Sequence, residues 1–133
     1  MGLDSVGLHD CHFSDDFGDE LVRILTFLQE QFDFDSWSLT RYEDDSWVVV
    51  KSVDRSYGFS EGDAFACQDS FCSRMVEGSG SQISPDSDQE PCYRLAPVRE
   101  RIPIRAYMGC PIMLNDGHLF GTLCAIQIGR AHV

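Results

Sequence analysis

The chain has 133 residues, a formal net charge of −12 and 43% hydrophobic residues, which predicts one globular domain with its own core. So acidic a surface repels phosphate backbones and anionic lipid, which argues against nucleic acid and against membrane insertion. No apolar run reaches the about 20 residues that span a bilayer, and the acidic N-terminus does not resemble a signal peptide, so we expect a cytoplasmic protein.

The N-terminal third begins with residues 1–16, which are rich in Gly, Asp and Ser and are expected to form a flexible tail. From Phe17 on, apolar residues recur at helical spacing and predict an amphipathic helix. These residues are Leu21, Ile24, Leu25, Leu28 and Phe32. One side of the stripe must pack on the rest of the fold, and the apolar surface left over predicts a homodimer through this helix.

Two pairs of strands are expected to form antiparallel hairpins. Alternating polar and apolar residues predict strands over Trp37–Tyr42 and Trp47–Val53, joined by the turn residues Glu-Asp-Asp-Ser. Later in the chain, strands are predicted over Ile104–Leu114 and Leu119–Ile128. The intervening Asn115–His118 contains Asp-Gly, which favours a tight hairpin turn.

The middle of the chain has little regular pattern. Asp69 is a candidate N-cap for a short helix from Ser70 to about Glu77, which Gly78 or Gly80 ends. A segment of about fifty residues without strong secondary structure is long for a connection and usually builds a binding site. With the strands and the first helix, the pattern predicts an α+β fold.

The stretches "DSFCSRMVEGSG", "ISPD" and "IRAYMGCPIMLNDGHLFGTLCAIQ" resemble the GAF sensor domains found N-terminal to bacterial diguanylate cyclases and histidine kinases. The resemblance implies a six-stranded antiparallel sheet with helices on one face and a loop-rich cap with a short helix on the other. It assigns residues 17–133 to a single GAF domain and about 54–105 to the cap. It also implies that a C-terminal linker helix and an output domain, such as a diguanylate cyclase, follow in the parent protein.

A GAF domain of this kind is expected to bind a small molecule or to dimerise in order to control its output domain. Neither the residues nor the resemblance identifies the ligand or a cofactor. The candidate ligand-binding residues are those expected to line the cap: Tyr57, Phe65, Asp69, Phe71, Cys72, Met75, Tyr93 and Tyr107.

Cys72 lies on the first turn of the predicted short helix, where the helix dipole lowers the pKa of a thiol. The alternative is a small residue in the pocket wall. No Cys-x-x-Cys or Cys-His pair lies near it in the sequence to supply a second thiol or an activating base, so we expect a pocket wall and no catalytic residue. Zinc-type ligand spacing is also absent from the sequence, and no metal site is expected.

Two other activities occur in GAF domains. A free methionine-(R)-sulfoxide reductase would use Cys72 with Cys92 or Cys67 as the second thiol, and Asp69 and Asp86 are candidates by position for its carboxylates. A bilin photoreceptor would attach its chromophore through a cysteine such as Cys92. Five arginines have two possible roles. If their side chains point into the cap, they would clamp an anion; otherwise they pair with surface carboxylates. These residues are Arg41, Arg94, Arg99, Arg101 and Arg105.

Overall fold

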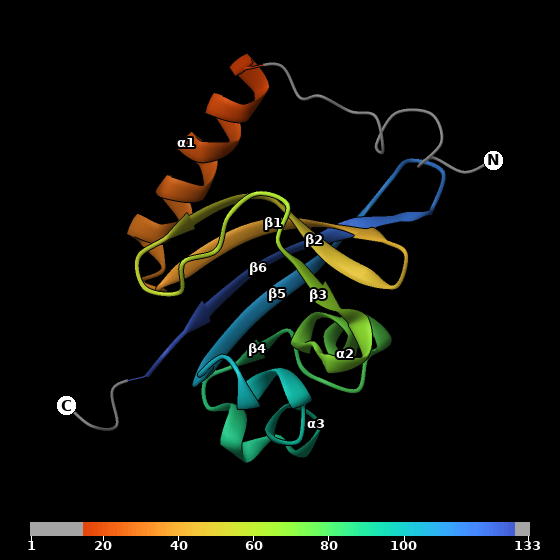
Figure 1. Cartoon of the computed structure of the whole chain (residues 1–133). Helices are drawn as coiled ribbons and strands as arrows, with labels where there is room; N and C mark the ends of the chain where they lie inside the picture. The colour runs from red at the N-terminus through yellow and green to blue at the C-terminus, as the bar shows by residue number, and fades with distance from the viewer. Residues whose placement is uncertain (1–14, 130–133) are drawn as a thin grey trace.

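The computed structural model describes residues 15–129, which form one antiparallel sheet of six strands in the order β3-β2-β1-β6-β5-β4 (Figure 1). The strands are β1 Ser36–Glu43, β2 Ser46–Asp54, β3 Ala64–Ala66, β4 Ile83–Ser84, β5 Ala106–Met113 and β6 Leu119–Gln127. The four long strands are those predicted from the sequence, and the α+β class is confirmed. The short strand β3 lies in a stretch that the sequence analysis left without regular structure.

The turns of the two hairpins differ in their chemistry. Between β1 and β2, Asp44 and Asp45 both have positive φ values of 52° and 58°, which aspartate tolerates better than most residues and which matches the twist of a hairpin. Between β5 and β6, Gly117 takes a φ of 92°. A residue with a Cβ would be strained there, so the predicted Asp-Gly turn has a direct steric basis.

One face of the sheet is covered by helix α1, Asp15–Gln31 (Figure 1). Leu25 is fully buried and packs with Trp37 and Ala125, which point to this face from β1 and β6. Ile24 and Phe27 remain about half exposed, at 49% and 58%. The helix therefore has a second apolar surface that the described residues do not cover.

The predicted tail and the helix overlap by two residues. Asp15 and Asp16, assigned to the tail above, already belong to α1, and the rest of that tail, residues 1–14, lies outside the described residues. Among the described residues, no helix has the length and apolar character needed to cross a membrane.

The cap covers the opposite face with short helices (Figure 1). Its α-helices are α2, Phe71–Glu77, and α3, Pro91–Arg94. Its 3₁₀ turns are Cys67–Asp69, Ser87–Gln89 and Pro97–Glu100. Buried side chains of α2, α3 and β5 form the centre of this layer, which is where the sheet and the cap meet.

The N-cap of α2 is Ser70, and the prediction of Asp69 was wrong. The Ser70 hydroxyl accepts from the backbone N–H of Ser73 at 3.2 Å, and Ser70 has the extended backbone that an N-cap needs. Asp69 instead closes the preceding 3₁₀ turn, and its carboxylate lies 3.5 Å from the Arg101 guanidinium. The predicted end of the helix at Gly78 is confirmed.

Candidate functional site

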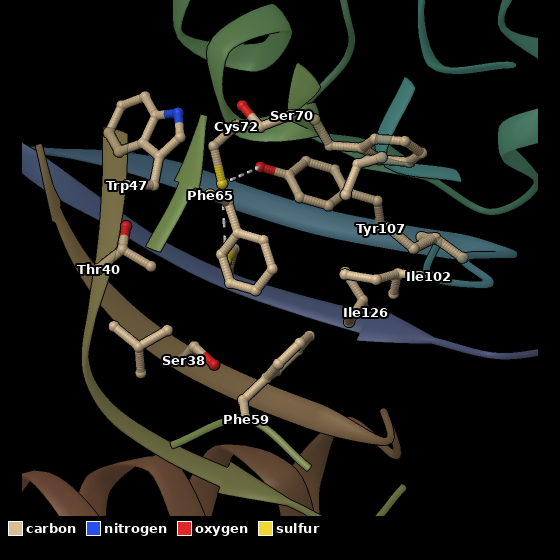
Figure 2. A pocket seen from close by; sticks show the side chains of 15 residues that line it. Ser38, Thr40, Trp47, Phe59, Phe65, Ser70, Cys72, Ile102, Tyr107 and Ile126 are labelled. Atoms are coloured by element: carbon tan, nitrogen blue, oxygen red, sulfur yellow. Dashed lines mark hydrogen bonds between the residues drawn. The ribbon is translucent and has the colours of Figure 1, made fainter. Parts of the chain in front are cut away.

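A cavity of about 80 Å³ lies between the cap and the sheet (Figure 2). Its lining is Ser38, Thr40, Trp47, Val49, Phe59, Phe65, Ser70, Phe71, Cys72, Val98, Ile102, Ile104, Tyr107, Cys124 and Ile126. Every one of these side chains is formally uncharged, and most are apolar. A site of this kind favours an uncharged ligand, because a buried charge without a partner is costly.

The sheet side of the cavity carries a line of hydroxyl groups. The side chains of Ser38 and Thr40 alternate onto this face of β1, as the two-residue period of a strand requires. Ser38 Oγ lies 3.0 Å from Ser52 Oγ on β2. Thr40 Oγ1 lies 2.7 Å from Thr122 Oγ1 on β6. These buried hydroxyls satisfy one another in pairs and leave a polar stripe on an otherwise apolar floor.

The cap side is built from stacked aromatic rings. Phe71 stacks on Tyr93 with ring centroids 4.5 Å apart, and Tyr107 meets Phe71 edge-on at 5.5 Å. Tyr107 fits because Gly109 follows it on the same face of β5: a Cβ at Gly109 would lie 2.3 Å from the Tyr107 hydroxyl. A glycine within a strand often admits a close neighbour, and here the neighbour is the phenol of Tyr107.

A loop after β2 closes one side of the cavity. Its backbone is gathered by Asp54, whose carboxylate accepts from the N–H groups of four successive residues, 56 to 59. The Tyr57 hydroxyl donates to the carbonyl of Pro103 at 2.6 Å and joins the loop to the segment before β5. Phe59 then meets Phe65 edge-on at 5.4 Å (Figure 2). The loop is therefore fixed at both ends over the cavity.

Cys72 lies at the junction of cap and sheet, with its sulfur pointing into the cavity (Figure 2). Its Sγ is 3.4 Å from Thr122 Oγ1, 3.6 Å from the Tyr107 hydroxyl and 3.9 Å from Cys124 Sγ. The Cys124 thiol and the two hydroxyls favour the thiolate against the effect of burial, and together they lower the pKa of Cys72 to about 7. The contact with Cys72, together with burial, raises the pKa of the Cys124 thiol well above its usual value.

The close approach of Cys124 corrects the expectation that no second thiol is available to Cys72. The sequence candidates, Cys67 and Cys92, do not supply it: among the described residues the sulfur in contact with Cys72 is that of Cys124. Cys92 Sγ instead donates to the Ser79 carbonyl at 3.3 Å. One signal could have pointed to Cys124, since it alternates with Thr122 along β6 and so shares the cap-facing side.

The eight predicted site residues divide into two groups. Phe65, Phe71, Cys72 and Tyr107 line the cavity. The others lie around it: Tyr57, Asp69, Met75 and Tyr93. Sequence reasoning did not include the floor of β1, β2 and β6 in the site, nor the isoleucines at positions 102, 104 and 126.

The arginines and acidic residues of the cap pair with one another outside the cavity lining. The guanidinium of Arg105 lies 3.0 Å from the Asp86 carboxylate, and Arg99 lies 2.5 Å from Asp88. Arg41 pairs with Glu43 in the same way at 2.7 Å, and Arg94 donates to a backbone carbonyl. These contacts fit surface pairing and give no anion clamp in the cavity. Within residues 15–129, no cluster of three potential metal ligands is found.

Comparison with known proteins identifies the relatives of this fold. The sequence model described as "GAF domain" matches residues 16–132. No curated protein matches the sequence significantly.

Among solved structures, the free methionine-R-sulfoxide reductase of Neisseria meningitidis aligns with a TM-score of 0.63 at 18% identity, covering 98% of this chain and 71% of the other. The blue-light absorbing form of the PixJ GAF domain of Thermosynechococcus elongatus aligns with a TM-score of 0.63 at 16% identity, covering 86% and 71%. The chromophore-binding domain of Stigmatella aurantiaca phytochrome P1 gives 0.60 at 13% identity; the match covers 92% of this chain but spans 48% of the phytochrome chain.

Proposed function

Because the chain belongs to the GAF domain family, we propose that it is a sensory domain that binds a small uncharged molecule in the cavity between its sheet and its cap. The observation that supports this proposal is the lining of the cavity, which contains no Asp, Glu, Lys, Arg or His side chain. The hydroxyl oxygens of Ser38 and Thr40, whose protons are engaged within the sheet, would accept from a donor group of the ligand, while the aromatic and aliphatic residues would surround its apolar part.

The size of the cavity limits the ligand. At about 80 Å³ it has about half the volume of an engineered apolar cavity of about 150 Å³ that accommodates benzene. A molecule of a few non-hydrogen atoms fits without rearrangement, and a larger one requires outward movement of the cap.

The signal would arise from ordering of the cap. A ligand that touches α2, the loop after β2 and the sheet at once binds the closed arrangement better than an open one, and so shifts the population toward it. We propose that α1 passes this change to a second copy of the domain and to a downstream output such as a diguanylate cyclase. The exposed Ile24 and Phe27 on α1 would form the dimer surface.

The proposed location is the cytoplasm. The five cysteines of the described part of the chain are free thiols, which is the state that a reducing compartment maintains.

We propose that the domain by itself is not an enzyme. Free methionine sulfoxide is a zwitterion, and a site for it needs charged partners for its amino and carboxylate groups. The two carboxylates considered from the sequence, Asp69 and Asp86, pair with arginines and lie outside the lining. A bilin is several times larger than benzene, and Cys92, its candidate attachment residue, also lies outside the lining.

The test is an NMR titration of the purified domain with 1-propanol and acetone as probes of the cavity. We expect saturable amide shifts at residues of β1, α2 and β6. Val49→Phe, which places a large side chain in the cavity, should abolish them. Val48→Phe is the matched control, because residue 48 is the strand neighbour whose side chain faces away from the cavity.

Two results would contradict the proposal. One is that the probes shift the spectrum of the Val49→Phe variant as strongly as that of the parent, because the binding site then lies elsewhere. The other is turnover of free methionine sulfoxide with a thiol reductant that is lost in Cys72→Ser, which would make the domain a reductase.

A further inference from the structure

The contact between Cys72 and Cys124 joins two layers of the fold. Cys72 is on the first turn of α2 in the cap, and Cys124 is in the middle of β6 in the sheet. The two residues are 52 positions apart in the sequence, and their sulfur atoms are 3.9 Å apart. At this distance the sulfurs are in van der Waals contact, so a covalent bond between them needs a small movement and no refolding.

The surroundings prepare the two thiols for different roles. The hydroxyls of Thr122 and Tyr107 lie within 3.6 Å of Cys72 Sγ and stabilise negative charge on it. Thr40 can donate to Thr122 across 2.7 Å, which leaves the Thr122 proton free to point at the sulfur. Cys124 keeps its proton, because a second negative charge beside the first is unfavourable. The pair thus contains one nucleophilic sulfur and one protonated thiol.

We propose that Cys72 and Cys124 form an oxidation site at which hydrogen peroxide entering the cavity converts the two thiols into a disulfide. Hydrogen peroxide is uncharged and little larger than water, so its entry places no charge in the apolar lining. Both sulfurs line the cavity, and attack from inside it is therefore open. This inference concerns the thiol pair itself and does not depend on which sensory ligand the cavity takes.

The chemistry balances in two steps. The Cys72 thiolate attacks one peroxide oxygen, the O–O bond breaks, and the leaving hydroxide takes a proton from solvent to become water, which leaves a sulfenic acid on Cys72. The Cys124 sulfur then attacks the Cys72 sulfur, the S–O bond breaks, and the Cys124 proton leaves with the oxygen as a second water. The two sulfurs together lose two electrons, and one peroxide is reduced.

The disulfide would tie the cap to the sheet. An S–S bond is about 2.05 Å long, so the two sulfurs must approach by nearly half of their present separation. The linkage joins α2 to β6 directly beneath the cavity, and outward movement of α2 is then restricted. Oxidation would therefore fix the cap in its closed position.

The experiment treats the reduced full chain with one equivalent of hydrogen peroxide, blocks the remaining thiols with iodoacetamide and maps the peptides by mass spectrometry. We expect a disulfide between Cys72 and Cys124 and a fall from six titratable thiols to four. In Cys124→Ser, a dimedone adduct should form on Cys72, because the sulfenic acid has no second thiol to react with. Cys92→Ser is the matched control and should form the same disulfide as the parent.

The circular dichroism spectrum of the parent chain should be the same before and after treatment. The proposal is wrong if peroxide then oxidises Cys67 or Cys92 first. In that case Cys72 and Cys124 would still react with iodoacetamide once the chain is denatured. Disulfides between two chains in place of the internal one would contradict it equally. Both results are measured on the parent chain alone.

Discussion

The loop that closes the cavity offers the sharpest test of how this fold builds its site. Asp54, at the end of β2, accepts from the backbone N–H of Tyr57 at 2.9 Å, of Phe59 at 3.0 Å and of Ser56 at 3.3 Å, and also from that of Gly58. One carboxylate thus fixes four consecutive amides, and the last of them belongs to Phe59, whose ring lines the cavity. Asp54→Ala removes all four acceptors at once and leaves the rest of the loop sequence unchanged.

The size of the effect follows from the exposure of this loop. A hydrogen bond to a charged group contributes about 1.5–3 kcal/mol, but the freed amides of residues 56 and 58 are exposed and recover most of that in water. We therefore expect the free energy of unfolding to fall by about 1–2 kcal/mol in total. The local effect is larger than the global one, because the loop can open without unfolding of the whole domain. Its amide hydrogens should therefore exchange at least about tenfold faster.

Urea unfolding and hydrogen exchange on the same samples measure the two effects. Asp63→Ala is the matched control, because the Asp63 carboxylate lies in the same loop and accepts from one amide, that of Ser60, at 2.9 Å. It should cost less than about half as much. If exchange in residues 56–59 is the same in Asp54→Ala as in the parent, the carboxylate does not hold the loop and the reasoning fails.

Three further outcomes are expected. Thr40→Val and Thr122→Val should each lower the free energy of unfolding by about 1–2 kcal/mol, because each removes the buried hydrogen bond between the two hydroxyls. The double variant should cost less than the sum, and additive losses in urea unfolding would exclude the pair. Gly109→Ala should push the Tyr107 phenol away from Cys72 and raise the pKa of the Cys72 thiol above about 7. The pH midpoint of Cys72 alkylation should then move upward. An unchanged midpoint would show that the Tyr107 hydroxyl does not stabilise the thiolate. Ile24→Glu should weaken any self-association seen by sedimentation without altering the fold, and equal association of variant and parent would place the dimer surface elsewhere.

The thiol also gives stability a dependence on pH. The folded-state pKa of Cys72 is lowered from 9.0 to about 7, so between these values the unfolded chain binds more protons than the folded one. The contribution of Cys72 to stability is therefore fully present above the unfolded value and is lost as the pH falls through about 7. The raised pKa of Cys124 acts in the opposite sense at higher pH.

Much of the fold could be predicted from local sequence features. The alternation in β1, β2, β5 and β6 and the turn residues between them are interactions of near neighbours, so they are visible in the sequence. The resemblance to GAF domains, which extends over these same segments, predicted how the sheet and the cap are arranged.

The tertiary structure alone decided which chemical groups meet. Asp69 had the residue type of an N-cap, but the preceding 3₁₀ turn rotates its side chain toward Arg101 and gives the cap to Ser70. The contact of Cys72 with Cys124 depends both on where α2 lies over the sheet and on the register of β6, and a shift of one residue would turn Cys124 to the other face. No local pattern encodes the position of α2 over the sheet, because it is set by packing between segments 52 residues apart.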